Sequence, residues 1–136
     1  MKFLAKRIIQ YLLLDSDLIN LLDGEKNIFP EFAPIKKDKY ITVSTTAGRD
    51  EDPYPIDRGT IVVSVVVSRK VENAWKICFD LVERVDSLLN KNEINVSSDS
   101  YKVLYLVRRD TSGLQIDETQ EYYWYSLEYE YMLINE

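Results

Sequence analysis

The strongest pattern along the chain is an apolar run, Gly59–Ser68 (GTIVVSVVVS), followed by a segment with helical periodicity. Val, Ile and Thr favour strands because their χ1 angles are restricted. One face of the run holds Ile61, Val63, Val65 and Val67. The other face holds Val62 and Val66 beside Ser64. Apolar side chains on both faces need at least partial cover, so the run predicts a central strand of a sheet.

The segment after this strand, VENAWKICFDLVERVDSLLN, predicts an amphipathic helix. Its apolar side recurs at spacings of three and four residues and comprises Ala74, Cys78, Leu81, Val82, Val85, Leu88 and Leu89. The opposite side comprises Lys76, Asp80, Glu83, Arg84, Asp86 and Ser87. Such a helix buries one stripe, and the strand that precedes it offers the nearest apolar surface. We therefore expect the helix to lie on that strand.

Two more helices are predicted near the N-terminus. Lys2–Leu14 has helical periodicity, and a short second helix covers Asp17–Leu22. Asp15 or Ser16 is the predicted cap of the second helix, and Gly24 is its predicted end.

Alternating side chains predict three further strands, over Lys39–Thr46, Tyr101–Arg109 and Tyr122–Ile134. Ile94 and Val96 mark a possible short strand. In the last and longest strand one face holds Tyr123, Tyr125, Leu127, Tyr129, Tyr131 and Leu133. Its other face holds Trp124, Ser126, Glu128 and Glu130. The length of this strand predicts that it pairs with more than one neighbour.

These elements predict a single α+β domain over residues 1–136. Its sheet is expected to be mainly antiparallel, with about four or five strands and with helices packed on one face. The expected order is α-α-β-β-α-β-β. The sequence shows no internal repeat.

A long loop, Ala47–Gly59 (AGRDEDPYPIDRG), is predicted between two of the strands, because it contains two Pro, two Gly and four acidic residues. Loops of this length in small domains are usually functional or disordered. The candidate partner-interface residues are Arg49, Asp50, Glu51, Asp52, Tyr54, Asp57 and Arg58. The acids lack the spacing of a calcium loop, so a solvated loop or a partner-binding loop is a better interpretation than a metal site.

Composition removes most catalytic chemistry. The chain has no His, one Cys and four isolated Gly, so it lacks imidazole bases, imidazole metal ligands and a phosphate-binding loop. Cys78 falls on the apolar side of its helix, where a small buried side chain is expected. We expect no enzyme activity and assign no catalytic residue, cofactor or metal.

Ten Tyr residues are an unusual excess for 136 residues, and Tyr suits half-buried strands and protein interfaces. Half-buried strand residues are the simpler interpretation for any one of them. The candidate subunit-interface strand comprises Tyr123, Trp124, Tyr125, Tyr129 and Tyr131.

A net charge of −6, without a basic stripe, argues against specific nucleic-acid binding. A single Cys fits a reducing compartment. The N-terminal apolar segment is interrupted by Lys6, Arg7 and Gln10, which argues against a signal peptide, and no run is long enough to span a membrane. We expect a soluble intracellular protein.

The order of motifs resembles the tail-terminator, or tail-completion, proteins of tailed bacteriophages. The resemblance lies in LLDSDLINLLDGEKNIFPEFAPIKKDKYITVSTT, then a loop, a valine-rich strand and a helix ending in Leu-Leu, and it covers Leu12–Leu89. It implies an α+β fold and a six-membered ring on the head-proximal end of the tail tube. The ring would stop tube polymerisation and present a surface to the head connector. The loop Ala47–Gly59 matches a long flexible loop of that family.

The partners that this resemblance implies are further copies of the chain, the tail tube protein and the connector or neck proteins. It places the protein in the virion tail after assembly in the host cytoplasm. Two alternatives stay open. One is another head–tail joining protein, and the other is a small α+β ligand-binding or regulatory module.

Overall fold

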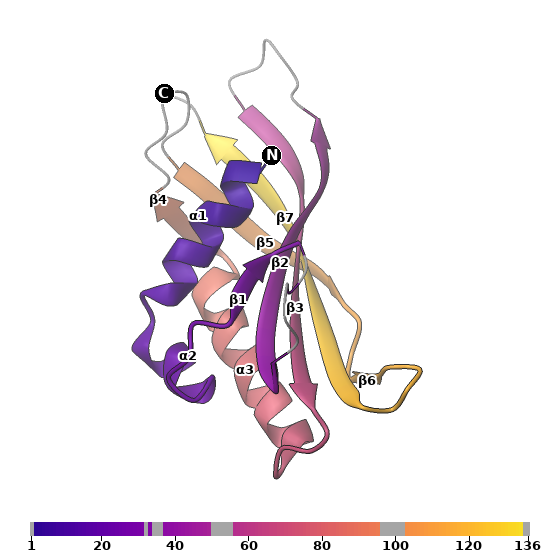
Figure 1. Cartoon of the computed structure of the whole chain (residues 1–136). Coiled ribbons are helices and arrows are strands. Elements are labelled where there is room, and N and C mark those ends of the chain that lie inside the picture. The colour runs from indigo at the N-terminus through magenta and orange to yellow at the C-terminus, as the bar shows by residue number, and fades with distance from the viewer. Residues whose placement is uncertain (1, 32, 34–36, 50–55, 96–102, 135–136) are drawn as a thin grey trace.

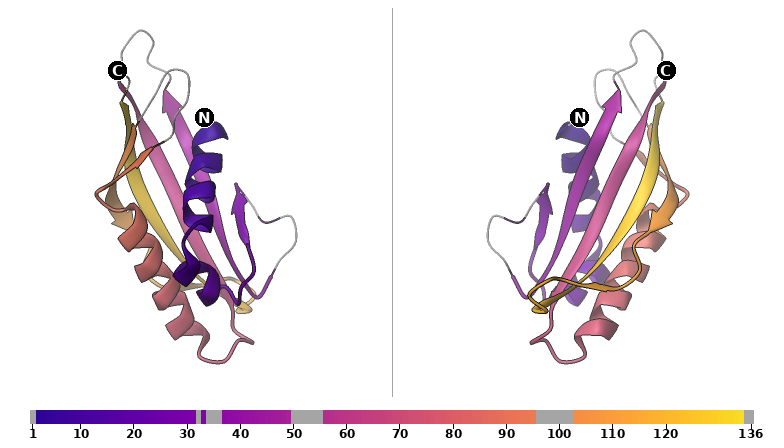
Figure 2. Two further views of the ribbon diagram at one scale, coloured as in Figure 1. Left: turned by 90° about the vertical axis from the view of Figure 1, so that its left-hand side faces the viewer. Right: turned by 90° about the vertical axis from the view of Figure 1, so that its right-hand side faces the viewer.

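In the part of the chain that the structure describes, seven strands form one curled sheet, and helices lie on one of its faces (Figures 1 and 2). A computed structural model of the chain describes residues 2–31, 33, 37–49, 56–95 and 103–134. Its elements are α1 (Lys2–Leu13), α2 (Ser16–Leu21), β1 (Ile28–Pro30), β2 (Lys39–Arg49), β3 (Ile56–Ser68), α3 (Ala74–Leu89), β4 (Asn92–Asn95), β5 (Val103–Thr111), β6 (Gln115–Ile116) and β7 (Tyr122–Ile134). The fold is of the α+β class, as predicted. The sheet has more strands than predicted, because the expected order omits the short strands β1, β4 and β6.

The sheet order is β1-β2-β3-β7-β5-β4, and β6 pairs with β7 beyond the end of β5. β1 and β2 are parallel, and every other pair is antiparallel. β3 lies between β2 and β7, which confirms its predicted central position. β7 pairs with β3, β5 and β6, which confirms that it has more than one neighbour.

The hydrophobic core lies between the helices and the sheet. α1 packs on β1 and β2, α3 packs mainly on β3 and β7, and α2 packs against α3. On the core face of β3 the side chains of Ile61, Val63, Val65 and Val67 are fully buried. The predicted apolar stripe of α3 is buried too, except for Leu88, which is half-buried. No helix among the described residues is both long and apolar enough to cross a membrane.

The opposite face of the sheet has no helix over it among the described residues, as the right-hand view of Figure 2 shows. Val62, Ser64 and Val66 of β3 are half-buried there. The sequence predicted partial cover on both faces of β3. On this face the cover comes from neighbouring side chains of the sheet itself.

The predicted loop Ala47–Gly59 is wrong at both ends. β2 continues to Arg49 and β3 begins at Ile56, and Arg49 lies opposite Arg58 after an irregularity that begins at Thr46. Backbone pairing with a long neighbouring strand extends both strands through glycines and charged residues that disfavour strands in isolation. Residues 50–55 lie outside the described residues.

Gly59, expected to end the loop, lies inside β3 for a packing reason. It is directly opposite Tyr131 of β7. A Cβ atom at Gly59 would lie 2.6 Å from the Tyr131 hydroxyl oxygen. The missing side chain therefore makes room for the ring of Tyr131, which is fully buried.

Ion pairs from Arg84 of α3 to Asp15 and Asp17 join α2 to α3. Asp15 caps α2 by accepting a hydrogen bond from the Leu18 amide at 2.8 Å. The Arg84 guanidinium of α3 donates to both carboxylate oxygens of Asp15, from Nε at 2.8 Å and from Nη2 at 2.5 Å. These bonds from Arg84 lower the pKa of Asp15 below its ordinary value of 3.8, even though burial acts in the opposite direction. Asp15 is thus both the predicted cap and a link between helices.

This pair should make stability depend on pH. The pKa of Asp15 is lower in the folded chain than in the unfolded chain. The ion pair therefore stabilises the fold fully above about pH 5 and stops doing so as the pH falls through the folded pKa. Asp15→Asn keeps a capping oxygen but loses the charge. We expect the difference in free energy of unfolding between wild type and Asp15→Asn, measured with urea, to be largest at pH 7 and to shrink steadily below pH 5. A difference that is constant with pH would contradict this assignment.

A pair of neighbouring valines tests which face of β3 is the core. Val65→Asp places an unpaired charge among fully buried side chains, and it should lower the free energy of unfolding by more than about 4 kcal/mol. Val66→Asp is the matched control, because its half-buried side chain points to the other face. Urea unfolding should find the control at least about 2 kcal/mol more stable than Val65→Asp. Equal losses in free energy of unfolding would show that the two faces of β3 exclude water equally.

Candidate functional site

The face of the sheet opposite the helices is a polar surface built across three central strands. Thr42 of β2, Ser64 of β3 and Ser126 of β7 lie side by side in register. The hydroxyl oxygens of Ser64 and Ser126 are 2.7 Å apart, within hydrogen-bonding distance. All three residues are half-buried. This face can form hydrogen bonds with a partner without needing a deep pocket.

Acidic side chains lie along the same face toward β5. Glu130 accepts a hydrogen bond from Arg109 Nε at 3.1 Å, whereas Glu128 lies opposite Asp110. A shallow hollow of about 270 Å³ at this point is lined by Val62, Asp110, Thr111, Ser112, Ser126 and Glu128. Among the described residues no group of three or more His, Cys, Asp or Glu could hold a metal ion. The acids face solvent across strands, as expected for the polar face of the last strand.

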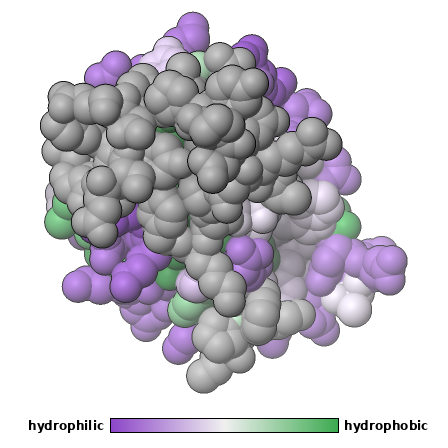
Figure 3. Space-filling model, turned by 90° about the horizontal axis from the view of Figure 1, so that it is seen from above, coloured by the Kyte–Doolittle hydropathy of each residue, from purple (hydrophilic) through white to green (hydrophobic). Residues whose placement is uncertain are grey.

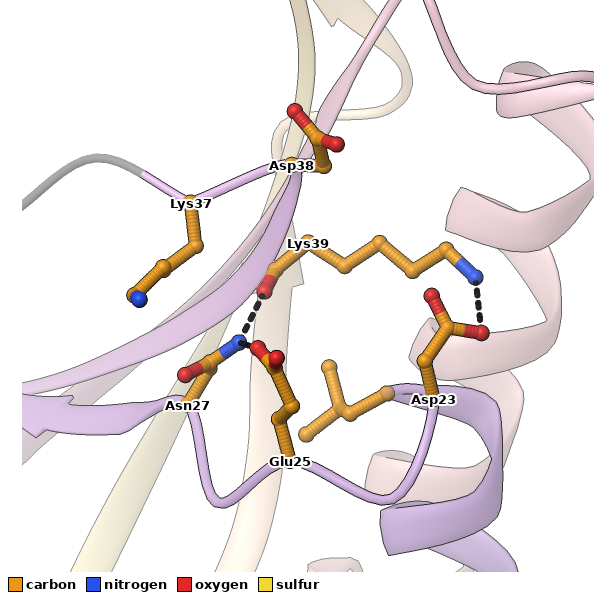
Figure 4. A pocket seen from close by; sticks show the side chains of 7 residues that line it. Asp23, Glu25, Asn27, Lys37, Asp38 and Lys39 are labelled. Atoms are coloured by element: carbon orange, nitrogen blue, oxygen red, sulfur yellow. Dashed lines mark hydrogen bonds and ion pairs between the residues drawn. The ribbon is translucent and has the colours of Figure 1, made fainter.

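A second hollow, of about 300 Å³, lies between the end of α2 and the start of β2 (Figure 4). Lys39 crosses it with a buried stem, and its Nζ atom lies 2.9 Å from the Asp23 carboxylate. Asn27, also buried, donates from Nδ2 to the Glu25 carboxylate at 2.8 Å and to the Lys39 carbonyl at 3.2 Å. Lys39 and Asn27 therefore join the loop before β1 to β2, and their bonds run to other residues of the hollow's own lining.

A third feature is an apolar surface that we call the aromatic corner. It comprises Trp75, Phe79, Leu114, Ile116, Tyr123 and Tyr125. Phe79 meets Tyr125 edge-on, with ring centroids 5.9 Å apart. Ile116 of β6 lies opposite Tyr123 of β7, so both share one face of the sheet. Trp75 is 53% exposed, Ile116 49% and Phe79 38%. These residues form an apolar surface where α3 and the β6–β7 pair meet.

Helix α3 has two distinct flanks. On one, Asp86 accepts hydrogen bonds from the Tyr129 hydroxyl and from Arg108 Nη1, both at 2.8 Å. Burial, together with the Asp86 carboxylate, raises the pKa of Tyr129 above its ordinary range, so the phenol stays protonated. Helical spacing places Trp75 and Phe79 on the same flank as Asp86. Arg84, which binds Asp15, lies on the other flank.

The residues proposed for the loop have different positions. Arg49 lies at the end of β2, and Asp57 and Arg58 lie in β3 opposite Leu133 and Met132 of β7. Asp50, Glu51, Asp52 and Tyr54 lie outside the described residues. In the view from above of Figure 3, the described residues that can be seen are mostly hydrophilic. A role in binding a partner stays a prediction for this segment.

The tyrosines of β7 differ in their exposure to solvent. Tyr129 and Tyr131 are fully buried under the helices, so they cannot contact a neighbouring subunit in this conformation. That part of the prediction is wrong, because β7 is an interior strand whose alternating face forms the core. Tyr123 and Tyr125 are half-buried on the same face and remain accessible at the aromatic corner. Trp124 is half-buried on the opposite face.

Cys78 lies on the buried side of α3 and is fully buried. Burial raises the pKa of its thiol to about 11, which disfavours the reactive thiolate. The side chain therefore fills space in the core, as its position in the helical pattern predicts.

Two features of the surface were not singled out from the sequence. Leu14 is 84% exposed immediately after α1, although it continues an apolar run. Trp75 and Phe79 lie just outside the apolar stripe of α3. In both cases the helical spacing in the sequence already places these apolar side chains outside the buried face of the helix. The spacing could not predict the neighbouring strand β6, because its two residues are too few to show a pattern.

The fold is similar to that of other solved structures. A chain of the virion of the native gene transfer agent particle superposes with a TM-score of 0.71 and 14% identity, and the match covers 94% of this chain and 92% of that one. A second solved chain, whose description states no function, superposes with a TM-score of 0.56 and 12% identity over 88% and 96% of the two chains. No protein-family model and no curated protein sequence matches the chain. At these identities the comparisons establish a shared fold.

Substitutions of Lys39 and Asp23 test whether the structure around the second hollow is stabilised by their ion pair or by the packing of the Lys39 side chain. The Asp23 side chain is 70% exposed, so Asp23→Asn should lower the free energy of unfolding by less than about 1 kcal/mol. Lys39→Ala removes a buried stem and should cost about 1–2 kcal/mol, whereas Lys39→Met keeps the stem and should stay close to wild type. Thermal and urea unfolding measure all three. A Met variant as unstable as the Ala variant would mean that the ammonium group is what matters.

Proposed function

We propose that this chain is a structural protein of a phage-like virion, and in particular a tail terminator. It would form a six-membered ring on the head-proximal end of the tail tube, stop tube polymerisation and provide the joining surface for the head connector. The observation that carries the proposal is the fold shared with a chain of the gene transfer agent virion over nearly the whole length of both. The finer assignment to a tail terminator is supported by the order of motifs in the sequence, which resembles that family.

A structural role also agrees with the chemistry of the described residues. Cys78 is buried with a raised pKa, and the polar groups of the second hollow bond to one another. The surfaces that stand out are a hydroxyl-rich sheet face and an apolar corner, which suit contacts with other proteins. A net charge of −6 would let DNA pass through a ring of such subunits without adhering to it.

Another head–tail joining protein is the second candidate. A shared fold with a virion chain favours this class as well, because it does not identify the position of that chain in the particle. The two roles differ in the partner that the ring binds first. A terminator binds the end of the tail tube, whereas a neck protein binds the connector.

The test is assembly with the tail tube protein from the same particle. Tubes polymerised with and without the purified chain are compared by light scattering and negative-stain microscopy. We expect a ring at one end of each tube and shorter tubes in its presence. Val66→Asp, which alters the open sheet face, and Lys91→Glu, which alters an exposed position after α3, serve as surface variants. Unchanged tube lengths and bare tube ends would refute a terminator, and binding to the connector alone would identify a neck protein.

A further inference from the structure

Strand β1 lies at one edge of the sheet (Figure 1). It has only three residues, Ile28–Pro30, and it pairs in parallel with Ile41–Val43 of β2. A strand at the edge of a sheet presents backbone N–H and C=O groups that can pair with a strand of another chain. The backbone groups that β1 turns outward therefore decide whether a further strand can join the sheet here.

Hydrogen bonds on either side of β1 fix the direction of its backbone groups. The Asn27 carbonyl oxygen accepts a hydrogen bond from the Ile41 amide, and the Glu31 amide donates to the Val43 carbonyl oxygen, both at 2.9 Å. Successive residues of a strand turn their backbone groups to opposite sides. The odd-numbered residues of this segment therefore turn their backbone groups toward β2, and the even-numbered residues turn theirs away from it.

Neither of the two outward-facing residues of β1 offers a donor to another strand. The Ile28 amide donates to the Lys26 carbonyl oxygen at 3.0 Å, within the same segment. Pro30 has no amide hydrogen. A strand laid along this edge would meet carbonyl acceptors only, so its own carbonyl groups would leave water without gaining a partner. Pairing at the outer edge of β1 is therefore unfavourable.

Beyond β1 the edge of the sheet is formed by β2 itself. There the pairing of β2 with β3 becomes irregular between Thr46 and Arg49. Irregularities of this kind bend and twist a strand, which makes its edge a poor template for a further strand. Strand β4 at the opposite edge differs, because each of its residues, Asn92–Asn95, has an amide hydrogen. Two separate features thus oppose strand addition on the β1–β2 side.

Side chains hold β1 in place although it is short. Asn27 is buried, and its Nδ2 atom donates to the Lys39 carbonyl oxygen at 3.2 Å (Figure 4). Ile28 is buried in the core, and α1 packs on both β1 and β2. Phe29 meets Tyr40 of β2 with ring centroids 6.4 Å apart. β1 therefore stays on β2 without the long ladder that usually fixes a strand.

We propose that β1 is a guard strand, which covers part of the edge of β2 and closes that edge to strand addition by other chains, further copies of this chain included. Copies of the chain then meet at this edge through side chains, and the sheet does not continue from one copy to the next through β1. An open edge would favour repeated pairing without closure at the high local concentration of an assembly. The device belongs to the single chain and does not depend on the tail-terminator role.

Pro30→Val tests the guard strand, because it adds one outward N–H donor. Pro30 is exposed, so the variant should stay folded. Ala33→Val is the matched control, since it adds the same side chain outside the strands and creates no donor in β1. Sedimentation velocity at chain concentrations up to about 1 mM should find self-association strengthened at least tenfold in Pro30→Val and unchanged in the control.

Amide hydrogen exchange, followed by NMR, shows whether the association uses the backbone of β1. Exchange at the new amide of position 30 should slow as the concentration of Pro30→Val rises, because that N–H becomes bonded to a second copy. The Val63 amide of the central strand is the internal reference, and its exchange should not change with concentration.

A second pair of variants loosens the guard strand instead. Asn27→Ala removes the hydrogen bond to the Lys39 carbonyl, whereas Glu25→Ala removes only the carboxylate that Asn27 also binds. Exchange of the Ile41 amide, which is bonded to the Asn27 carbonyl, should become at least tenfold faster in Asn27→Ala. Self-association should increase with it, and Glu25→Ala should behave like wild type.

The outcomes are distinct. Stronger association of Pro30→Val, with slowed exchange at position 30, supports the guard strand. Association of Pro30→Val equal to that of wild type would show that the proline is no barrier, and the proposal would be wrong whatever Asn27→Ala does. An equal gain in Ala33→Val would also overturn it, because added apolar surface would then drive association. None of these results bears on tube capping, which the assembly assay measures separately.

Discussion

The pairing of β3 with β7 is the constraint on which the rest of the structure depends. The two strands pair along their full length, from Ile56 opposite Ile134 to Ser68 opposite Tyr122. Because side chains alternate along both strands, this one register decides which residues face the helices. It puts Val63 opposite Leu127 and Ile61 opposite Tyr129, both in the core. A shift by one residue would move every one of these side chains to the open face.

The same register explains how much of the structure could be predicted from the sequence. β3, α3 and β7 have strong periodicity, so the type of each element and the two faces of each follow from the pattern. The short strands β1, β4 and β6 have two to four residues each, too few for a clear period. Of the three, β4 lies where Ile94 and Val96 mark a possible short strand. They exist because an edge of the sheet was available for pairing. The ends of the predicted loop were wrong for a related reason, since β2 and β3 extend by pairing with each other and with β7.

The candidate site could be predicted less well than the fold. An excess of Tyr indicated an interface, but a sequence pattern does not tell an interior strand from an edge strand. Tyr129 and Tyr131 alternate in the same way as Tyr123 and Tyr125, and only the path of α3 across the sheet separates buried from accessible rings. Likewise, Arg84 and Asp15 are far apart in the chain, and no spacing rule connects them. Contacts of this kind depend on how helices are placed on the sheet.

Helix α3 fixes the geometry that a ring would need. Its flanks are tied to different parts of the molecule, one to α2 through Arg84 and Asp15, the other to β5 and β7 through Asp86, Arg108 and Tyr129. Leu14 directly precedes Asp15 in the first of these links, and the aromatic corner adjoins the second. The distance and angle between the two surfaces are therefore set by packed, hydrogen-bonded elements. In a head-to-tail assembly that angle determines whether successive subunits close into a ring or continue as a filament. In a ring of such subunits, the packing of α3 against α2, β5 and β7 would hold the contact surfaces of each subunit in a fixed relation.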